Sequence, residues 1–255
     1  MVDLHCHVLP GIDDGPAKLE ESVAMCRAAR RDGTRTVVAT PHVNWDYPDV
    51  TAVVIQDQVA AVNGALRAAA IDVTVRMGAE VALSRAGELS DLELSVLALG
   101  GGPYVMLEFP WTSAASGAIN ALRAFARRGH GIVLAHPERS PALQRDLGLV
   151  RDLVESGVLC CLDVASLAER ADRQVRSAAW QMLGERLAHA IASDAHDAVR
   201  RPPELAAALE RAGLTVTEVE YFTSEGPEAI INGERVTSPP KVREPRRRGF
   251  RRWKP

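Results

Sequence analysis

The sequence predicts an α/β protein with a parallel sheet, closed into a distorted, TIM-like (β/α)7 barrel. Short apolar segments alternate with segments rich in helix formers, about seven times within residues 1–240. This alternation is typical of parallel strands joined by right-handed crossovers. An open doubly wound sheet is the alternative. The segment after the first strand, HCHVLPGIDDG, matches neither G-x-G-x-x-G nor a P-loop. The absence of such a phosphate-binding loop disfavours the open sheet.

The elements follow from periodicity and from their end signals. Strands are expected at short apolar runs, at 1–5, 36–40, 73–77, 104–109, 131–135, 158–164 and 188–192. The segment 18–32 places Leu19, Val23 and Cys26 on one helical face. Further helices are expected at 50–70, 118–128, 147–156, 171–186 and 203–211, several of them ending at a glycine.

Charge divides the chain into one domain, residues 1–240, and a basic tail, residues 241–255. The tail has eight Lys or Arg and one Glu, a net charge of +7, so residues 1–240 carry −10 of the total of −3. The acidic body argues against a broad nucleic-acid surface. The tail is short of aliphatic residues, so we expect it to be disordered. Its charge suits peripheral contact with an anionic membrane.

No apolar run reaches the length of a membrane span, and no signal-peptide pattern is present, so a cytoplasmic protein is expected. The cysteines indicate buried thiols rather than a disulfide framework, since two are adjacent and the others are scattered. No CxxC pair provides a thiolate zinc site. The cysteines are Cys6, Cys26, Cys160 and Cys161.

Nine His, Asp or Glu side chains follow the carboxyl ends of six predicted strands. In a barrel these ends meet at one mouth, where active sites are built. Five imidazoles and four carboxylates suit Mn²⁺, Fe or Zn²⁺, and they are too many for one ion. The nine are His5, His7, Asp14, His42, Glu80, Glu108, His136, Asp194 and His196.

Each of these motifs is weak by itself. A single His-x-His is common by chance, and a glutamate at a strand end is usually a solvated residue. His130 and His189 each precede a strand, at the opposite end of the barrel, and are interpreted as structural. The hypothesis of a metal site therefore depends on the joint pattern.

Several segments together resemble the PHP superfamily, and within it the tyrosine phosphatases of bacterial capsule and exopolysaccharide gene clusters. The resemblance extends from Met1 to about Asn232. It separates this branch from histidinol phosphatases and polymerase-attached domains that share His-x-His. The segments are MVDLHCHVLPGIDDGP, ATPH, GAEV, MLEFPW, AHPER, and ASDAH followed by RRPP.

The resemblance implies the PHP fold and a site for three divalent metal ions, usually manganese. By position, His5, His7, Glu80 and Asp194 would hold one ion, and Glu80 would bridge to a second, also held by Glu108 and His136. Asp14, His42 and His196 would hold the third. Arg139 and Arg201 match the family's phosphate-binding arginines. The implied substrate is the phosphotyrosine tail of a bacterial tyrosine kinase.

The cysteines do not supply a competing mechanism. A cysteine-dependent tyrosine phosphatase needs an arginine six residues after its cysteine, to complete the phosphate loop. The residues at those places are Ile12, Asp32, Ser166 and Leu167.

The sequence departs from the family pattern at three places. Cys161 and Asp163 stand where a Gln and an Asn are usual, and Val43 replaces a second histidine after ATPH. The usual Glu-Asn-Pro turn reads 224–227, SEGP. We therefore expect altered substrate contacts.

Three alternatives remain open. The chain could hydrolyse a small phosphomonoester such as histidinol phosphate, because the ligand set is shared. It could bind a phosphorylated kinase tail without catalysis, which the intact ligand set disfavours. It could be a nuclease, which the acidic body disfavours.

Overall fold

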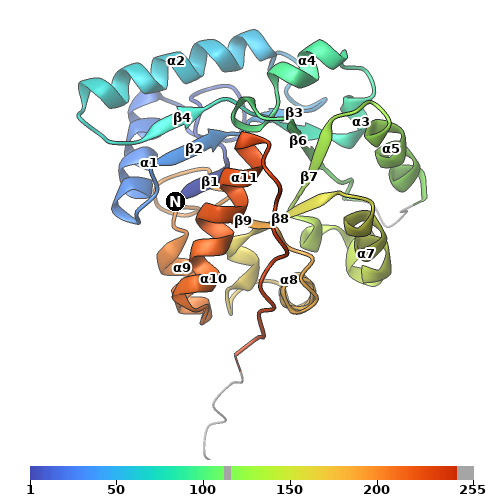
Figure 1. Ribbon diagram of the computed structural model, residues 1–255. Helices are drawn as coiled ribbons and strands as arrows, with labels where there is room; N and C mark the ends of the chain where they lie inside the picture. The colour runs from blue at the N-terminus through green and yellow to red at the C-terminus, as the bar shows by residue number, and fades with distance from the viewer. Residues whose placement is uncertain (112–115, 246–255) are drawn as a thin grey trace, which may run out of the picture.

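Parallel strands surrounded by helices form the protein in the computed structural model, which describes residues 1–111 and 116–245 (Figure 1). The strands are β1 (Val2–Cys6), β2 (Thr36–Ala39), β3 (His42–Val43), β4 (Thr74–Arg76), β5 (Glu80–Ala82), β6 (Tyr104–Glu108), β7 (Gly131–Ala135), β8 (Leu159–Asp163) and β9 (Ala190–Ala192).

All but the last three helices lie between strands in the sequence, and those three follow β9. They are α1 (Leu19–Arg31), α2 (Ala52–Ala68), α3 (Leu83–Ala86), α4 (Asp91–Val96), α5 (Ser116–Ala126), α6 (Pro141–Arg145), α7 (Leu147–Glu155), α8 (Arg173–Gly184), α9 (Ala206–Ala212), α10 (Val216–Glu220) and α11 (Gly226–Asn232). Short 3₁₀ segments are η1 (Leu99–Gly101), η2 (Pro137–Arg139) and η3 (Val164–Leu167), and η4 (Tyr221–Glu225) is π-helical.

The strands make two parallel sheets within the described residues, with orders β1-β2-β4 and β3-β5-β6-β7-β8-β9. β3 continues β2 after a break at Thr40–Pro41, and β5 continues β4 after a similar break. The chain after β9 lies beside β1, since Asp194 N–H donates to His5 O at 2.9 Å and His7 N–H to Ala195 O at 2.9 Å. The last strand thus returns to the first, as predicted for a distorted (β/α)7 barrel.

The core has an inner and an outer part because alternate side chains of a strand point to opposite faces. The inner cluster includes Leu4, Met106, Val133 and Cys161, all fully buried, and α11 contributes Ile230. The outer cluster lies between strands and helices. The inward-facing side chains of β6, β8 and β9 are apolar along most of each strand and acidic at its carboxyl end. Acidic side chains therefore gather at one end of the barrel.

The predicted strands and helices of the barrel are confirmed to within a few residues, except that the helix expected at 203–211 begins at Ala206. Its first turn is held by Asp32, whose carboxylate accepts the N–H groups of Leu205, Ala206 and Ala207 at 2.5, 2.8 and 3.1 Å. That cap comes from the end of α1, so the local proline pair does not define the start. The short helices α3, α4, α6, α10 and α11 and the π-helical η4 were not predicted.

The first five residues of the tail expected at 241–255 contact the domain. Val242 is buried and its N–H donates to Leu183 O at 3.3 Å, and Glu244 pairs with Arg176 at 2.6 Å. One apolar side chain and one acid within the basic run thus attach residues 241–245 to α8. The rest of the expected tail, 246–255, lies outside the described residues. No helix of the described chain is long and apolar enough to cross a membrane.

Candidate metal centre

All nine predicted ligands lie at the carboxyl-terminal end of the barrel. β1 carries His5 and leads into His7, while the loop that follows brings Asp14 back to the mouth. The other ligands follow in strand order: His42 and Glu80 begin β3 and β5, Glu108 ends β6, His136 follows β7, and Asp194 and His196 follow β9. The barrel thereby joins residues up to about 190 positions apart in the sequence.

Glu80 is the centre of the cluster. Its Oε2 lies 3.4 Å from Nε2 of His5, 3.4 Å from Nε2 of His7 and 3.0 Å from Nδ1 of His42. Its Oε1 lies 2.7 Å from Nε2 of His136. Oε2 and His42 Nδ1 are both buried, and although they lie 3.0 Å apart neither has a hydrogen bond of suitable geometry. Buried polar atoms without a hydrogen bond fit a cation that several of them share.

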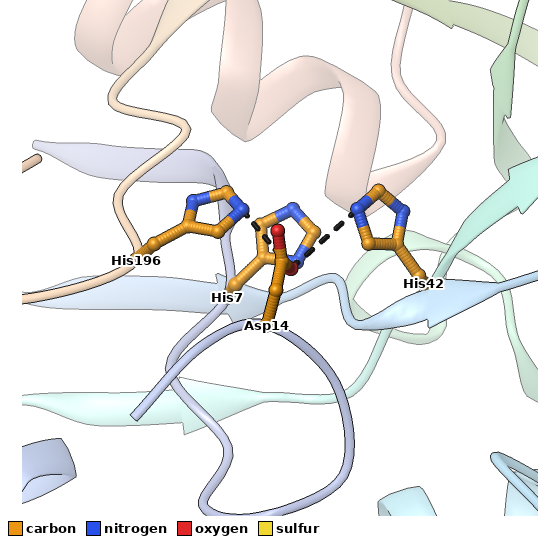
Figure 2. A group of neighbouring side chains, drawn as sticks. All are labelled: His7, Asp14, His42 and His196. Carbon is orange, nitrogen blue, oxygen red and sulfur yellow. Dashed lines mark ion pairs between the residues drawn. The ribbon is translucent and has the colours of Figure 1, made fainter. Parts of the chain in front are cut away.

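A second set of side chains surrounds Asp14. Figure 2 shows the carboxylate of Asp14 between the rings of His42 and His196, with His7 behind it. Its Oδ1 lies 3.2 Å from Nε2 of His196 and 3.6 Å from Nε2 of His42. Ligand atoms of these four residues all lie within 4.8 Å of one another, the spacing that a shared ion requires.

The structure groups the ligands somewhat differently from the arrangement that the resemblance implies. His5, His7 and Glu80 form one group, and Asp194 Oδ1 lies 3.4 Å from Nε2 of both histidines. A further group contains His42, Glu80 and Glu108. His136 is absent from these groups and reaches the cluster through Glu80.

Two arginines converge on the outer oxygen of Asp194. Arg139 and Arg201 each place a guanidinium nitrogen 2.7 Å from Asp194 Oδ2. Both side chains are partly exposed, at 28% and 42%. The predicted pair therefore lies at the rim of the cluster with N–H groups left over for an anion. Asp163 Oδ2 is 3.5 Å from the same nitrogen of Arg139.

Two supporting residues were missed by the sequence analysis. Asp13 Oδ2 lies 2.8 Å from Nδ1 of His7 and accepts the backbone N–H of His42 at 3.1 Å. A carboxylate on the far nitrogen of a ligating histidine fixes its tautomer and orientation. Trp111 donates its indole N–H to Glu108 Oε1 at 2.7 Å. Asp13 lies in the motif GIDDG and Trp111 in the motif MLEFPW, but the spacing of these motifs does not indicate a role for either residue.

Charge within the cluster is strongly perturbed. Burial alone would raise the pKa of Glu80, but the imidazoles of His5 and His136 hold it well below its usual value. Burial opposes protonation of His136, yet Glu80 and Asp194 raise its pKa to about 9. A ligating imidazole is neutral, so metal binding at His136 would be accompanied by release of a proton.

Backbone strain is concentrated at two of these positions. His136 has φ 31° and Asp194 has φ 47°, in the left-handed region that residues other than glycine rarely adopt. Such strain persists only where surrounding contacts enforce it, and it clusters at functional sites. Here the contacts are the backbone bonds from His136 N–H to Cys161 O at 2.8 Å and from Asp194 N–H to His5 O at 2.9 Å.

The model of the family "Capsular polysaccharide synthesis, CpsB/CapC" matches residues 1–231. The chain belongs to this family. The match covers the whole barrel and all nine predicted ligands, so the resemblance seen in the motifs is confirmed.

Relatives in this family are similar along nearly their full length. The chain is 29% identical to the tyrosine-protein phosphatase YwqE of Bacillus subtilis, over 98% of this chain and 99% of that protein. It is 27% identical to the tyrosine-protein phosphatase CpsB of Streptococcus pneumoniae, over 92% of this chain and 97% of that protein.

Solved structures agree with the fold. A crystal structure from a study of YwqE and CpsB, described as unique metal-dependent tyrosine phosphatases, superposes with a TM-score of 0.79 and 27% identity, covering 95% of this chain and 100% of that one. An amidohydrolase from Mycoplasma synoviae has a TM-score of 0.55 at 12% identity, covering 96% of this chain and 90% of that one. That second likeness shows the fold alone.

The departures from the pattern expected from the resemblance lie at both ends of the barrel. Val43 is buried in the outer core, Cys161 is buried in the inner core, and Asp163 lies beside Arg139. The segment 224–227 is helical rather than a turn. A Cβ at Gly226 would lie 2.2 Å from the carbonyl oxygen of His189, so this position requires glycine.

All four cysteines are free and buried, as predicted. Burial raises the pKa of each thiol, that of Cys26 to about 12. A thiolate nucleophile is therefore disfavoured by the environment as well as by the sequence.

Proposed function

We propose that this protein is a metal-dependent tyrosine phosphatase. The observation that carries the proposal is the convergence of nine His, Asp and Glu side chains on one barrel mouth, with two arginines at its rim. The names of its relatives YwqE and CpsB support the same activity. The alternative of a small phosphomonoester, histidinol phosphate, has no support among these relatives.

The ligand chemistry fits divalent metal ions, and we infer three, with manganese favoured and iron or zinc also suited. Glu80 would be shared, with His5, His7 and Asp194 on one side and Glu108 and His136 on the other. Asp14, His42 and His196 would hold the third ion. Bound ions of this kind supply Lewis-acid polarisation of phosphoryl oxygens and lower the pKa of water.

The chain's own residues would hold the phosphate. Arg139 and Arg201 present planar guanidinium groups toward the cluster, and such groups bind phosphate oxygens through paired hydrogen bonds. Their present partner, Asp194 Oδ2, fixes both groups on the same side of the mouth. A phosphomonoester entering the mouth would therefore meet positive charge on its outer face.

Trp111 favours an aryl phosphate. Its side chain is 52% exposed, and its ring lies 5.7 Å from that of His136 and 5.1 Å from the guanidinium of Arg139. The hydrogen bond to Glu108 fixes the indole. An exposed aromatic face beside the phosphate site provides a surface on which the ring of phosphotyrosine can stack.

The substrate we propose is the phosphotyrosine tail of a tyrosine kinase that controls capsular or exopolysaccharide synthesis. The family match and the relatives' names support this choice. An enzyme acting on such a tail would work in the cytoplasm. A phenolate is a good leaving group, so the chain needs no strong general acid.

The test compares three substrates with and without Mn²⁺: para-nitrophenyl phosphate, a phosphotyrosine peptide and histidinol phosphate. We expect hydrolysis of both aryl phosphates, abolished by EDTA and restored by Mn²⁺. Preferred turnover of histidinol phosphate would replace the proposal with its alternative. Full turnover in metal-stripped protein would refute it.

A further inference from the structure

A cavity of about 850 Å³ adjoins the proposed phosphate site. It lies between the segment that follows β8 and the segment that follows β9, so it opens at the same end of the barrel as the metal cluster. Asp163 and Arg201 line its inner end, and Pro245 lines it where the described chain stops. The nine proposed ligands are not among its lining residues.

Arginine dominates the charge of this cavity. Five arginines line it, against three carboxylates (Asp163, Glu169 and Glu204), which leaves a local charge of +2 on a body of −10. The cavity is therefore positively charged although the domain as a whole is negative, and it would attract an anion. The arginines are Arg170, Arg176, Arg200, Arg201 and Arg211.

These arginines are not equally engaged. Arg176 pairs with Glu244 at 2.6 Å and Arg211 with Glu204 at 2.8 Å. Arg200 is 90% exposed, and its one ion pair, with Asp197, spans 3.9 Å. Arg170 is exposed and has no ion-pair partner in residues 1–111 and 116–245. Arg170 and Arg200 are therefore available to a ligand.

We propose that this cavity binds acidic residues that flank the phosphotyrosine of a peptide substrate. The inference rests on the proposed function and specifies its substrate class. A peptide whose phosphate lies at Arg139 and Arg201 must continue away from the mouth. The cavity that begins at Arg201 offers a route on which carboxylates meet guanidinium groups. Affinity would come from pairs with Arg170 and Arg200.

The experiment uses the full chain and two labelled peptides with an unphosphorylated tyrosine, flanked in one by Glu and in the other by Gln. Fluorescence anisotropy at low salt should show about tenfold tighter binding of the Glu peptide, with the preference shrinking as salt is added. Equal affinities would overturn the proposal. Turnover of para-nitrophenyl phosphate with Mn²⁺ reports the proposed function separately, because that substrate has no flanking residues.

Variants locate the binding site. Arg170→Glu, and more so Arg170→Glu with Arg200→Glu, should remove most of the preference and leave para-nitrophenyl phosphate turnover unchanged. Arg170→Gln, a gentler change, should remove part of it. Arg127→Glu, an exposed arginine before β7 at the other end of the barrel, is the charge-matched control and should retain it.

Two further results would refute the cavity as the site. In one, truncation after Pro245 abolishes the preference while Arg170→Glu with Arg200→Glu retains it, so the terminal segment alone binds the acids. In the other, the double variant loses binding to phosphatidylserine vesicles but keeps the peptide preference, so the arginines serve a lipid surface.

Discussion

Adjacent aspartates in the first loop have different roles. The carboxylate of Asp14 faces His42 and His196, whereas that of Asp13 holds His7 from behind and accepts N–H groups of Gly15 and His42. The sequence pair Asp-Asp does not say which one turns toward the metal, since that depends on the path of the loop. Asp13 is a positioning residue, and its influence passes through His7.

Asp13→Asn should weaken Mn²⁺ binding by about 10- to 100-fold without unfolding the protein. Asparagine offers one acceptor oxygen where the carboxylate offers two, so at least one of the three donors loses its partner. Titration calorimetry with Mn²⁺ measures the effect, and circular dichroism checks the fold. Asp46→Asn, at an exposed aspartate in the loop between β3 and α2, is the control. Unchanged affinity in Asp13→Asn would contradict the role.

Trp111→Ala should lower the selectivity for aryl over alkyl phosphates. An aromatic pair contributes about 0.5–1.5 kcal/mol, so the ratio of kcat/KM for para-nitrophenyl phosphate to that for glycerol phosphate should fall about 2- to 12-fold. Trp111→Phe should restore most of the ratio. Trp45, 56% exposed and stacked with Arg85 instead, is the matched control. An equal loss on both substrates would indicate a structural role only.

At the scale of elements, the sequence predicted the regular strands well and the broken ones poorly. β7 has the predicted bounds, 131–135, because its apolar run is continuous. β3 and β5 were not separated from β2 and β4 because they contain only two and three residues. Pro41 has no N–H for the sheet, yet its carbonyl accepts Glu80 N–H at 3.1 Å. The pairing therefore resumes through contacts that a single segment does not reveal.

His189, which precedes β9, lies at the end of the barrel opposite the metal cluster. The sequence analysis interpreted it as a structural residue and not as a ligand. His189 is buried, and its Nδ1 accepts the N–H of Cys160 at 3.1 Å. Burial lowers its pKa from 6.5 to about 4. The folded protein therefore keeps this ring neutral at a pH where an unfolded chain would protonate it.

This shift predicts a pH-dependent contribution to stability. Between pH 6.5 and about 4 the unfolded chain binds the proton and the folded chain does not, so the free energy of unfolding falls as the pH falls. The full shift corresponds to about 3 kcal/mol. His189→Gln does not titrate, so its stability relative to wild type should improve as the pH is lowered from 7 to 4.5 in urea melts. A constant difference across that range would contradict the assignment.

At the scale of the whole molecule, the site is a product of barrel closure. The residue types and their positions after strands predicted which nine side chains gather at the barrel mouth. They did not predict which of these side chains contact one another. His136 reaches Glu80, and Arg139 and Arg201 share one oxygen of Asp194, because the backbone at His136 and Asp194 takes left-handed conformations. Spacing along the chain carries no signal for such local geometry.

The proposed ligands are supplied from around the barrel, so metal binding should stabilise the molecule as a whole. Six strands or their ends contribute, including both sides of the seam between β9 and β1. Ions that bind only the folded state stabilise it by about 2.7 kcal/mol at 100 times the Kd. For a domain of this size that corresponds to an increase in Tm of roughly 5–10 °C.

Thermal unfolding with Mn²⁺ and with EDTA measures this gain, and two histidines test where it arises. His136→Ala removes an imidazole 2.7 Å from Glu80 and should abolish most of the gain. His130→Ala removes one at the other end of the barrel, near Asp91, and should preserve it. Both variants lose the same side chain, so a difference between them reflects position alone. Equal Tm values with Mn²⁺ and with EDTA in wild type, or an equal loss in both variants, would show that the mouth of the barrel is not where metal stabilises the fold.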